Sequence, residues 1–185
     1  MFNRKKTTMA AKIAVLAVNP VNGSGLFQYL ETFYENGIDY RVYAVAPTTE
    51  IKTNSGIRLI ADDVVARLKG YEDEFDGVVF SCGDAVPVFQ EHRTEPYNVE
   101  MLQVLQNFGQ KGKIMIGHCA AALMFEIVGI AQGKRLAVHP MAKPAIVHGI
   151  ATDEVAEVDG NFYTAQQEHA LPELLPRLID RLKAL

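Results

Sequence analysis

Two cysteines are the residues in this sequence whose neighbours best suit nucleophilic chemistry. Cys119 lies in Gly117-His-Cys-Ala120, between the apolar segments 113–116 and 121–128. If the first segment is a strand and the second a helix, Cys119 occupies the tight turn of a nucleophile elbow and stands above the sheet edge. The start of the helix would favour the thiolate, so the pKa of Cys119 should fall and its reactivity rise.

Other interpretations of both cysteines stay open on spacing alone. Free cysteines are common as inert core residues, so Cys119 could also be a buried structural thiol. Cys82 ends another apolar segment, in Cys82-Gly-Asp84, and no clear helix follows it. We interpret Cys82 mainly as a small apolar residue at a strand end, with redox chemistry beside Cys119 as the second interpretation.

Composition and charge favour a cytoplasmic protein without metal, nucleic-acid or membrane partners. The 185 residues contain only two cysteines, and neither has a partner at metal-ligand spacing. The formal net charge is −4, and no basic stripe stands out that would attract nucleic acid. No apolar stretch approaches the roughly 20 residues that a membrane helix needs. We therefore expect no metal and no cofactor.

Short apolar segments alternate with amphipathic ones, and this alternation defines the elements that must position the cysteines. The predicted strands are residues 12–18, 40–46, 76–81, 113–116 and 135–138. The predicted helices are residues 26–36, 62–69, 98–109, 121–128 and 171–185. Residues 51–59 predict an exposed hairpin, and residues 154–165 predict a second one around Asp159-Gly160.

This order of elements predicts an α/β fold, a three-layer α/β/α sandwich around a mostly parallel sheet. Strands that alternate with helices are joined by right-handed crossovers, and ligands bind beyond the carboxyl ends of such strands. No linker, repeat or low-complexity tract interrupts the chain, whose length suits one ordinary domain. We expect a disordered tail over residues 1–10 and a single domain over residues 11–185.

Residues 114–149 resemble the core block of the ThiJ/PfpI family. The shared pattern is an apolar strand, a Cys-containing elbow, a helix, Gly-x-Lys/Arg-Leu/Val, and then His-Pro or Tyr-Pro. KIAVLAV at 12–18 resembles the family's first strand, and DGVVFSCGD at 76–84 resembles its D-x-V-V-x-P-G-G strand. VDGNFYTA at 158–165 resembles its D-G-N-x-x-T-S hairpin. The family includes the Parkinson-linked protein deglycase and an archaeal intracellular protease.

The resemblance covers nearly the whole chain and carries expectations for fold and site. It implies a flavodoxin-like fold, shared with class I glutamine amidotransferases, and a homodimer. It implies that Cys119 attacks an electrophilic carbonyl while the N–H groups of Gly83 and Ala120 form an oxyanion hole. It gives His139, 20 residues after Cys119, a part in orienting groups or moving protons. Considered alone, His139 would more simply make a structural hydrogen bond.

The chain departs from the family pattern where many members place a Glu hydrogen-bonded to the nucleophile, at the start of the first helix. Residues 21–25 hold no carboxylate, and Asn22 and Ser24 are the nearest polar residues. Asp84, after the oxyanion glycine, could partly replace that Glu. The simpler interpretation of Asp84 is a turn residue that caps the next segment.

Two further departures concern residues near the elbow. Ala120 follows Cys119, as in the deglycase branch, and His118 precedes it, where a packed or solvated side chain is the simpler interpretation. Gln166 takes the place of the family's Arg after the hairpin. Glu168-His169 is discounted as a triad remnant because its order and spacing differ from those of amidotransferases. The predicted substrate-binding residues are Asn22, Ser24, His118 and Gln166.

The leading functional hypothesis is an enzyme, a cofactor-free hydrolase or a glyoxalase- or deglycase-like enzyme. Its substrate would be a small carbonyl or amide compound. The alternative is a thiol redox sensor or stress-protective protein without turnover, because the missing Glu would hold the thiolate less specifically. A third possibility is a degenerate member that binds a small ligand or a partner protein, with an inert Cys119.

Overall fold

The computed structural model describes residues 10–185 of the chain. The tail expected over residues 1–10 lies, apart from Ala10, outside the described residues. Within the described part, none of the helices is both long enough and apolar enough to cross a membrane.

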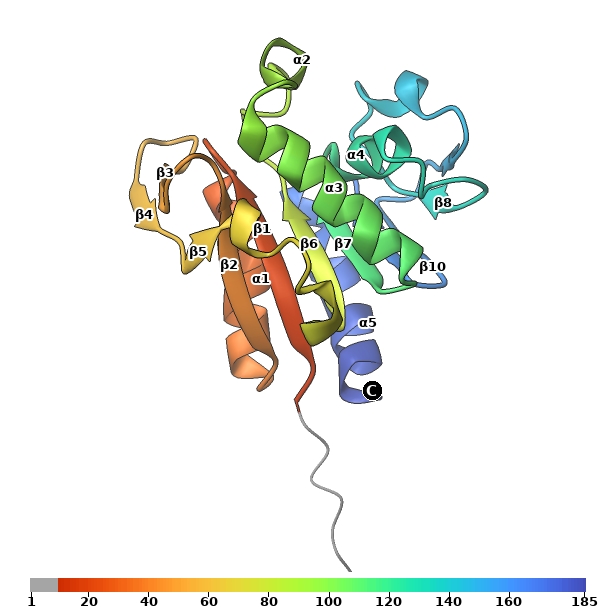
Figure 1. The fold of residues 1–185 in the computed structure, drawn as a ribbon. Coiled ribbons are helices and arrows are strands. Elements are labelled where there is room, and N and C mark those ends of the chain that lie inside the picture. The colour runs from red at the N-terminus through yellow and green to blue at the C-terminus, as the bar shows by residue number, and fades with distance from the viewer. Residues whose placement is uncertain (1–9) are drawn as a thin grey trace, which may run out of the picture.

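A seven-stranded sheet forms the middle of the described chain, in the order β10-β11-β7-β6-β1-β2-β5 (Figure 1). Every neighbouring pair is parallel except β10 and β11, which form the expected terminal hairpin. The strands are β1 (Lys12–Val18), β2 (Asp39–Val45), β5 (Asp63–Val64), β6 (Gly77–Ser81), β7 (Ile114–His118), β10 (Ala156–Asp159) and β11 (Phe162–Ala165). The predicted mostly parallel α/β sheet is confirmed.

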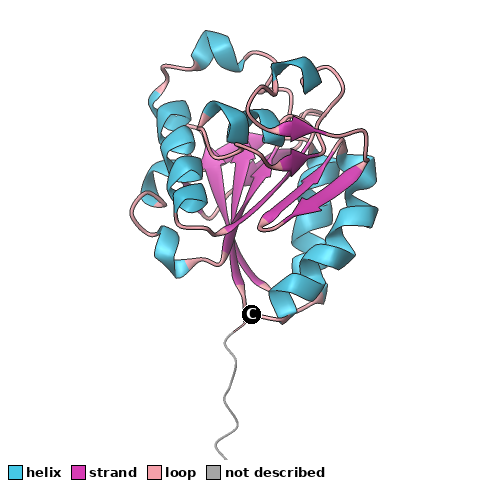
Figure 2. Cartoon of the chain, turned by 90° about the vertical axis from the view of Figure 1, so that its right-hand side faces the viewer, coloured by secondary structure: helices cyan, strands magenta, loops and turns pink. Residues whose placement is uncertain are grey.

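Helices cover both faces of this sheet, which gives three layers (Figures 1 and 2). One face carries α1 (Gly23–Glu35) and α5 (Leu171–Lys183), and the other carries α3 (Pro96–Gln110) and α4 (Ala121–Ile127). The short α2 (Phe89–His92) lies beyond the end of α3. Because both faces are covered, β1, β6 and β7 are buried almost throughout, as their continuous apolar runs predict.

Two small sheets lie outside the main one. The hairpin expected over residues 51–59 is present as β3 (Glu50–Lys52) and β4 (Arg58–Ile60), which pair antiparallel. The segment expected as a strand over residues 135–138 is shorter, because only β8 (Arg135–Leu136) pairs, in parallel with β9 (Ile150–Ala151).

The helix predicted over residues 62–69 is wrong. Asp63–Val64 form the edge strand β5, and Val65–Arg67 form a single 3-10 turn. Val64 pairs with Ala44 of β2, and the buried Val65 and Leu68 pack into the core. In this short segment, pairing with a distant strand outweighs local helix propensity.

The register of the central strands brings three strand ends together. Phe80 of β6 pairs with Gly117 of β7, and Ala17 of β1 pairs with Ser81 of β6. The loops after β1, β6 and β7 therefore all leave the sheet at the carboxyl ends of its strands, which is where parallel α/β proteins bind their ligands.

Candidate functional site

Cys119 lies in a sharp strand-to-helix turn between β7 and α4. Its φ is 59°, and among the described residues it is the one non-glycine residue with a positive φ. Such a conformation costs about 1–3 kcal/mol and persists where the surroundings enforce it. Here the Cys119 N–H donates to the Ala165 carbonyl (3.0 Å), and its carbonyl accepts from the His139 N–H (2.9 Å).

Small residues make this turn possible. A Cβ on Gly117 would lie 2.2 Å from the Cβ of Ala121, so β7 can approach α4 this closely only with glycine there. Gly83, on the neighbouring loop, is equally constrained. A Cβ on Gly83 would lie 2.2 Å from the Pro20 carbonyl oxygen, because this loop packs against the segment after β1.

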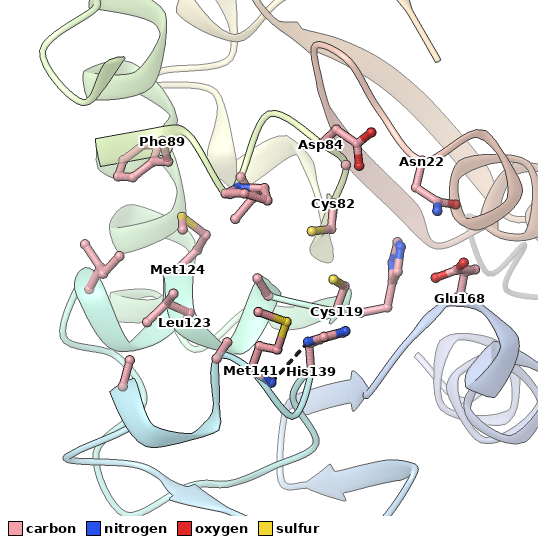
Figure 3. A pocket seen from close by; sticks show the side chains of 18 of the residues that line it. Asn22, Cys82, Asp84, Phe89, Cys119, Leu123, Met124, His139, Met141 and Glu168 are labelled. Carbon is pink, nitrogen blue, oxygen red and sulfur yellow. Dashed lines mark hydrogen bonds between the residues drawn. The ribbon is translucent and has the colours of Figure 1, made fainter. Parts of the chain in front are cut away.

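The side chain of Cys82 points toward that of Cys119, and both sulfurs border the same cavity (Figure 3). A hydrogen bond between the two thiols lowers the pKa of Cys119, and the Ala120 N–H adds to this, although burial opposes it. The same hydrogen bond and burial raise the pKa of Cys82 well above its ordinary value. Of the two thiols, the half-buried Cys119 is therefore the one that ionises more readily, and the buried Cys82 is the one that keeps its proton.

Backbone donors surround the sulfur pair. The Ala120 N–H lowers the pKa of both thiols, and the Gly83 N–H lowers that of Cys82. These are the two N–H groups that the family resemblance assigns to an oxyanion hole. Donors fixed in this way can stabilise negative charge on sulfur, or on an oxygen that develops next to it.

His118 is packed rather than solvated, and it also lines the cavity. Its Nδ1 lies 3.2 Å from the Tyr29 hydroxyl, and its Nε2 has no hydrogen-bond partner within residues 10–185. Burial lowers the pKa of His118 to about 4, against an opposing effect of Glu168. A Cβ on Gly25 would lie 2.5 Å from Nε2, so α1 holds the ring closely. The cavity wall thus includes a neutral ring whose unpaired Nε2 is buried on the side of α1.

His139 connects the elbow with the opposite wall of the cavity. Its Nδ1 accepts a hydrogen bond from the Met141 N–H (3.2 Å), as Figure 3 shows. In the neutral ring the proton therefore lies on Nε2, which makes His139 a donor toward the cavity. The backbone N–H of His139 thus makes a structural hydrogen bond to the Cys119 carbonyl, while the ring lines the cavity.

These groups line a cavity of about 510 Å³. All of the predicted site residues border it except Ser24 and Gln166. The exposed Ser24 hydroxyl accepts from Gln28, and the Gln166 amide donates to the Asp153 carbonyl, so neither side chain is directed at a ligand here. The remaining wall is largely apolar and includes Val86, Phe89, Leu123, Met124, Ile127 and Met141.

Asn22 and Asp84 border the cavity but are engaged in local structure. The Asn22 Oδ1 accepts from the Gly25 N–H (2.7 Å) and caps α1. Asp84 and Asn54 form two reciprocal hydrogen bonds of 3.0 and 3.1 Å. The exposed Asp84 carboxylate acts on Cys119 only through its charge, which raises the thiol pKa. This agrees with the simpler interpretation of Asp84 as a turn residue.

Sequence reasoning gives too little weight to Cys82 and Glu168 in this site. It favours a packing role for Cys82 and keeps chemistry beside Cys119 as the second interpretation, whereas in the structure Cys82 is the largest cause of the lowered pKa of Cys119. The spacing of Glu168-His169 argues against a triad, yet Glu168 borders the cavity, and its charge acts on the pKa of both His118 and Cys119. Its signal would have been its place shortly after β11, which pairs with β7.

Comparison with known proteins places this site in a family. A model of the DJ-1/PfpI family matches residues 11–181. Protein ppBat of Bacteroides thetaiotaomicron is 66% identical over 175 residues, which cover 95% of this chain and 100% of that protein. The chain belongs to the DJ-1/PfpI family. The resemblance to the ThiJ/PfpI family is thereby confirmed.

Solved structures of DJ-1/PfpI proteins agree with the fold. The "putative protease I" of Bacteroides thetaiotaomicron has 65% sequence identity and a TM-score of 0.93, with 94% of this chain and 99% of that chain covered. A DJ-1 superfamily protein of Salmonella typhimurium has 20% identity and a TM-score of 0.81, with 95% and 91% covered. The second likeness concerns the fold alone.

Proposed function

We propose that this chain is a cysteine-dependent enzyme that acts on small electrophilic carbonyl compounds. The observation that carries the proposal is the Cys119 sulfur, whose pKa is lowered by Cys82 and which borders a cavity of about 510 Å³. A cavity of this size and a half-buried sulfur favour a small molecule over an extended protein segment as the substrate.

Members of the DJ-1/PfpI family are commonly dimers, and a homodimer remains our prediction here.

The first chemical step follows from the groups around the sulfur. The Cys119 thiolate attacks the carbonyl carbon, a C–S bond forms, and the C=O electron pair moves onto oxygen. The Ala120 N–H, joined by that of Gly83, stabilises the oxyanion. Because Nδ1 of His139 is an acceptor, its Nε2–H is the group we assign to protonate that oxygen.

A second group has to exchange protons with the bound intermediate. We assign this role to Glu168, a carboxylate at the cavity wall near His118 and Cys119. His118 stays neutral at pH 7, and because its Nε2 is buried against Gly25 of α1, the ring shapes the cavity wall and does not exchange protons with the substrate. Glu168 would thus supply, from a different place in the chain, the carboxylate that residues 21–25 lack.

Turnover of methylglyoxal, together with panels of thioesters, amides and peptides, tests the proposal. We expect the wild-type chain to consume methylglyoxal or another small carbonyl compound and Cys119→Ala to lose that activity by at least a hundredfold. Glu154→Gln, a change of an exposed carboxylate away from the cavity, should leave the rate unchanged. Equal rates for the wild type and Cys119→Ala across the whole panel would rule out the enzyme.

A further inference from the structure

Cys82 and Cys119 occupy equivalent places at the ends of two neighbouring parallel strands. Phe80 of β6 pairs with Gly117 of β7, and each cysteine lies two residues beyond that pair. Neighbouring strands are about 5 Å apart, which is within the separation of about 4.4–6.8 Å between Cα atoms that a disulfide bridges. The two side chains already face one another (Figure 3), and each thiol shifts the pKa of the other.

We propose that Cys119 and Cys82 form a dithiol site that reduces hydroperoxides and closes an internal disulfide. The Cys119 thiolate attacks the terminal oxygen of a hydroperoxide, an S–O bond forms, the O–O bond breaks, and the leaving alkoxide takes a proton from solvent. Cys119 is then a sulfenic acid. The Cys82 sulfur attacks this sulfur, an S–S bond forms, and hydroxide leaves with the Cys82 proton as water. One hydroperoxide and two thiols give an alcohol, a water molecule and a disulfide.

The surroundings of the two thiols give each a different part in this sequence. Cys119 is half-buried at the cavity wall, where a small hydroperoxide can reach it. Cys82 is 2% exposed, so an oxidant in solution reaches it less readily than it reaches the half-buried Cys119. The first thiol therefore meets the oxidant, and the second resolves the oxidised product.

Oxidation of Cys119 also activates Cys82. The hydrogen bond to Cys119 and the charge of its thiolate are two of the three causes that raise the pKa of Cys82. A neutral sulfenic acid removes that charge, whereas the Ala120 and Gly83 N–H groups, which favour a Cys82 thiolate, remain in place. Oxidation of Cys119 thus removes one of the causes that keep Cys82 protonated.

The disulfide has consequences for the rest of the site. It protects Cys119 from further oxidation to the sulfinic acid, and it removes the nucleophile until an external dithiol reduces the bond. This chemistry goes beyond the proposed carbonyl activity and requires none of it.

The test is a mass-spectrometric peptide map of the full chain after reduction, removal of reductant and addition of one equivalent of hydrogen peroxide. We expect a Cys82–Cys119 linked peptide, lighter by two hydrogens than the two peptides together, in a chain that stays monomeric on a non-reducing denaturing gel. Dithiothreitol should restore both thiols. In Cys82→Ser, Cys119 should instead be trapped by dimedone as a sulfenic acid and then gain a second oxygen.

Matched variants and a clear opposite result make the test decisive. Cys119→Ser should leave Cys82 a free thiol under the same treatment. If Cys82→Ser does not fold, the linked peptide in the wild type still decides. The proposal is overturned if the wild type forms the Cys119 sulfinic acid as fast as Cys82→Ser does, or if the only disulfides join two chains. The experiment measures peptide masses and uses no carbonyl substrate. A chain that is inactive toward methylglyoxal could therefore still form the disulfide.

Discussion

At the scale of single residues, Cys82 provides the hydrogen bond that many family members obtain from a carboxyl group. The family's Glu at the start of the first helix is absent, because Asn22, Gly23 and Ser24 occupy the segment that leads into α1. The Cys82 thiol donates to Cys119 from the neighbouring strand end instead, with the Ala120 N–H as a second donor. The Cys82 thiol cannot replace a carboxylate in proton transfer, and in the proposed enzyme Glu168 has that role.

Replacing Glu168 by Gln separates proton transfer from thiol activation. We expect methylglyoxal turnover in Glu168→Gln to fall at least tenfold, because the variant cannot exchange a proton at that position. The charge of Glu168 raises the pKa of Cys119, so its removal should leave alkylation of Cys119 at pH 7 as fast as in the wild type, or faster. Steady-state rates and iodoacetamide kinetics measure the two effects.

The control for this change is Glu154→Gln, which removes an exposed carboxylate outside the cavity and should alter neither rate. A Glu168→Gln variant with full turnover would contradict the role given to Glu168. Slower alkylation together with slower turnover would mean that Glu168 instead supports the thiolate.

At the scale of elements, a buried carboxylate of α4 holds residues 147–149, which follow the cavity-lining residues 139–145. Glu126 accepts hydrogen bonds from the N–H groups of residues 147–149 and contacts the His148 ring at 2.7 Å. Its side chain is 7% exposed. Burial alone would raise its pKa, but these donors outweigh it, so the pKa of Glu126 lies below its ordinary value.

We therefore predict that Glu126→Gln lowers the free energy of unfolding at pH 7 by about 1–3 kcal/mol, since an amide replaces an ionised acceptor of several hydrogen bonds. Urea denaturation measures the change. Glu31→Gln, on the exposed surface of α1, should cost less than about 0.5 kcal/mol. The difference should shrink as the pH falls and Glu126 becomes protonated. Equal stability of the two variants at pH 7 would show that this anchor contributes little.

Local sequence predicted most of the elements but not their neighbours. The segments 12–18 and 113–116 could be recognised because continuous apolar runs suit strands buried on both faces. The segment 62–69 could not, because Val64 is a strand residue only through Ala44 of β2. The contact between Cys82 and Cys119 likewise depends on β6 lying next to β7, which the sequence does not state. Glu168 borders the same cavity as the elbow because β11, which it follows, lies on the other side of β7.

At the scale of the whole molecule, the buried His118 makes the free energy of unfolding depend on pH in the mildly acidic range. The pKa of His118 is about 4 in the folded chain because burial disfavours the charged ring, against roughly 6.5 for an unfolded histidine. Between these values only the unfolded chain binds the proton. The free energy of unfolding therefore falls as the pH drops through this window, by up to about 1.4 kcal/mol per pH unit.

Urea denaturation between pH 4 and 7 measures this slope, and His118→Gln should reduce it, because glutamine does not titrate. Protonation of Glu126 adds its own loss of stability in acid, toward the low-pH end, so the comparison between the variant and the wild type isolates the histidine. A His118→Gln slope identical to that of the wild type would contradict the assignment.

The most direct test of the whole account is the pH dependence of Cys119 alkylation by iodoacetamide, followed by mass spectrometry of the peptide that carries it. We predict a pKa below the ordinary thiol value of about 8.5 in the wild type, because Cys82 and Ala120 donate to the thiolate. In Cys82→Ala this pKa should rise, and in Cys82→Ser, which keeps a donor, it should rise less. A wild-type pKa at or above the ordinary value, unchanged in Cys82→Ala, would contradict a site built on a thiolate that its neighbouring thiol stabilises.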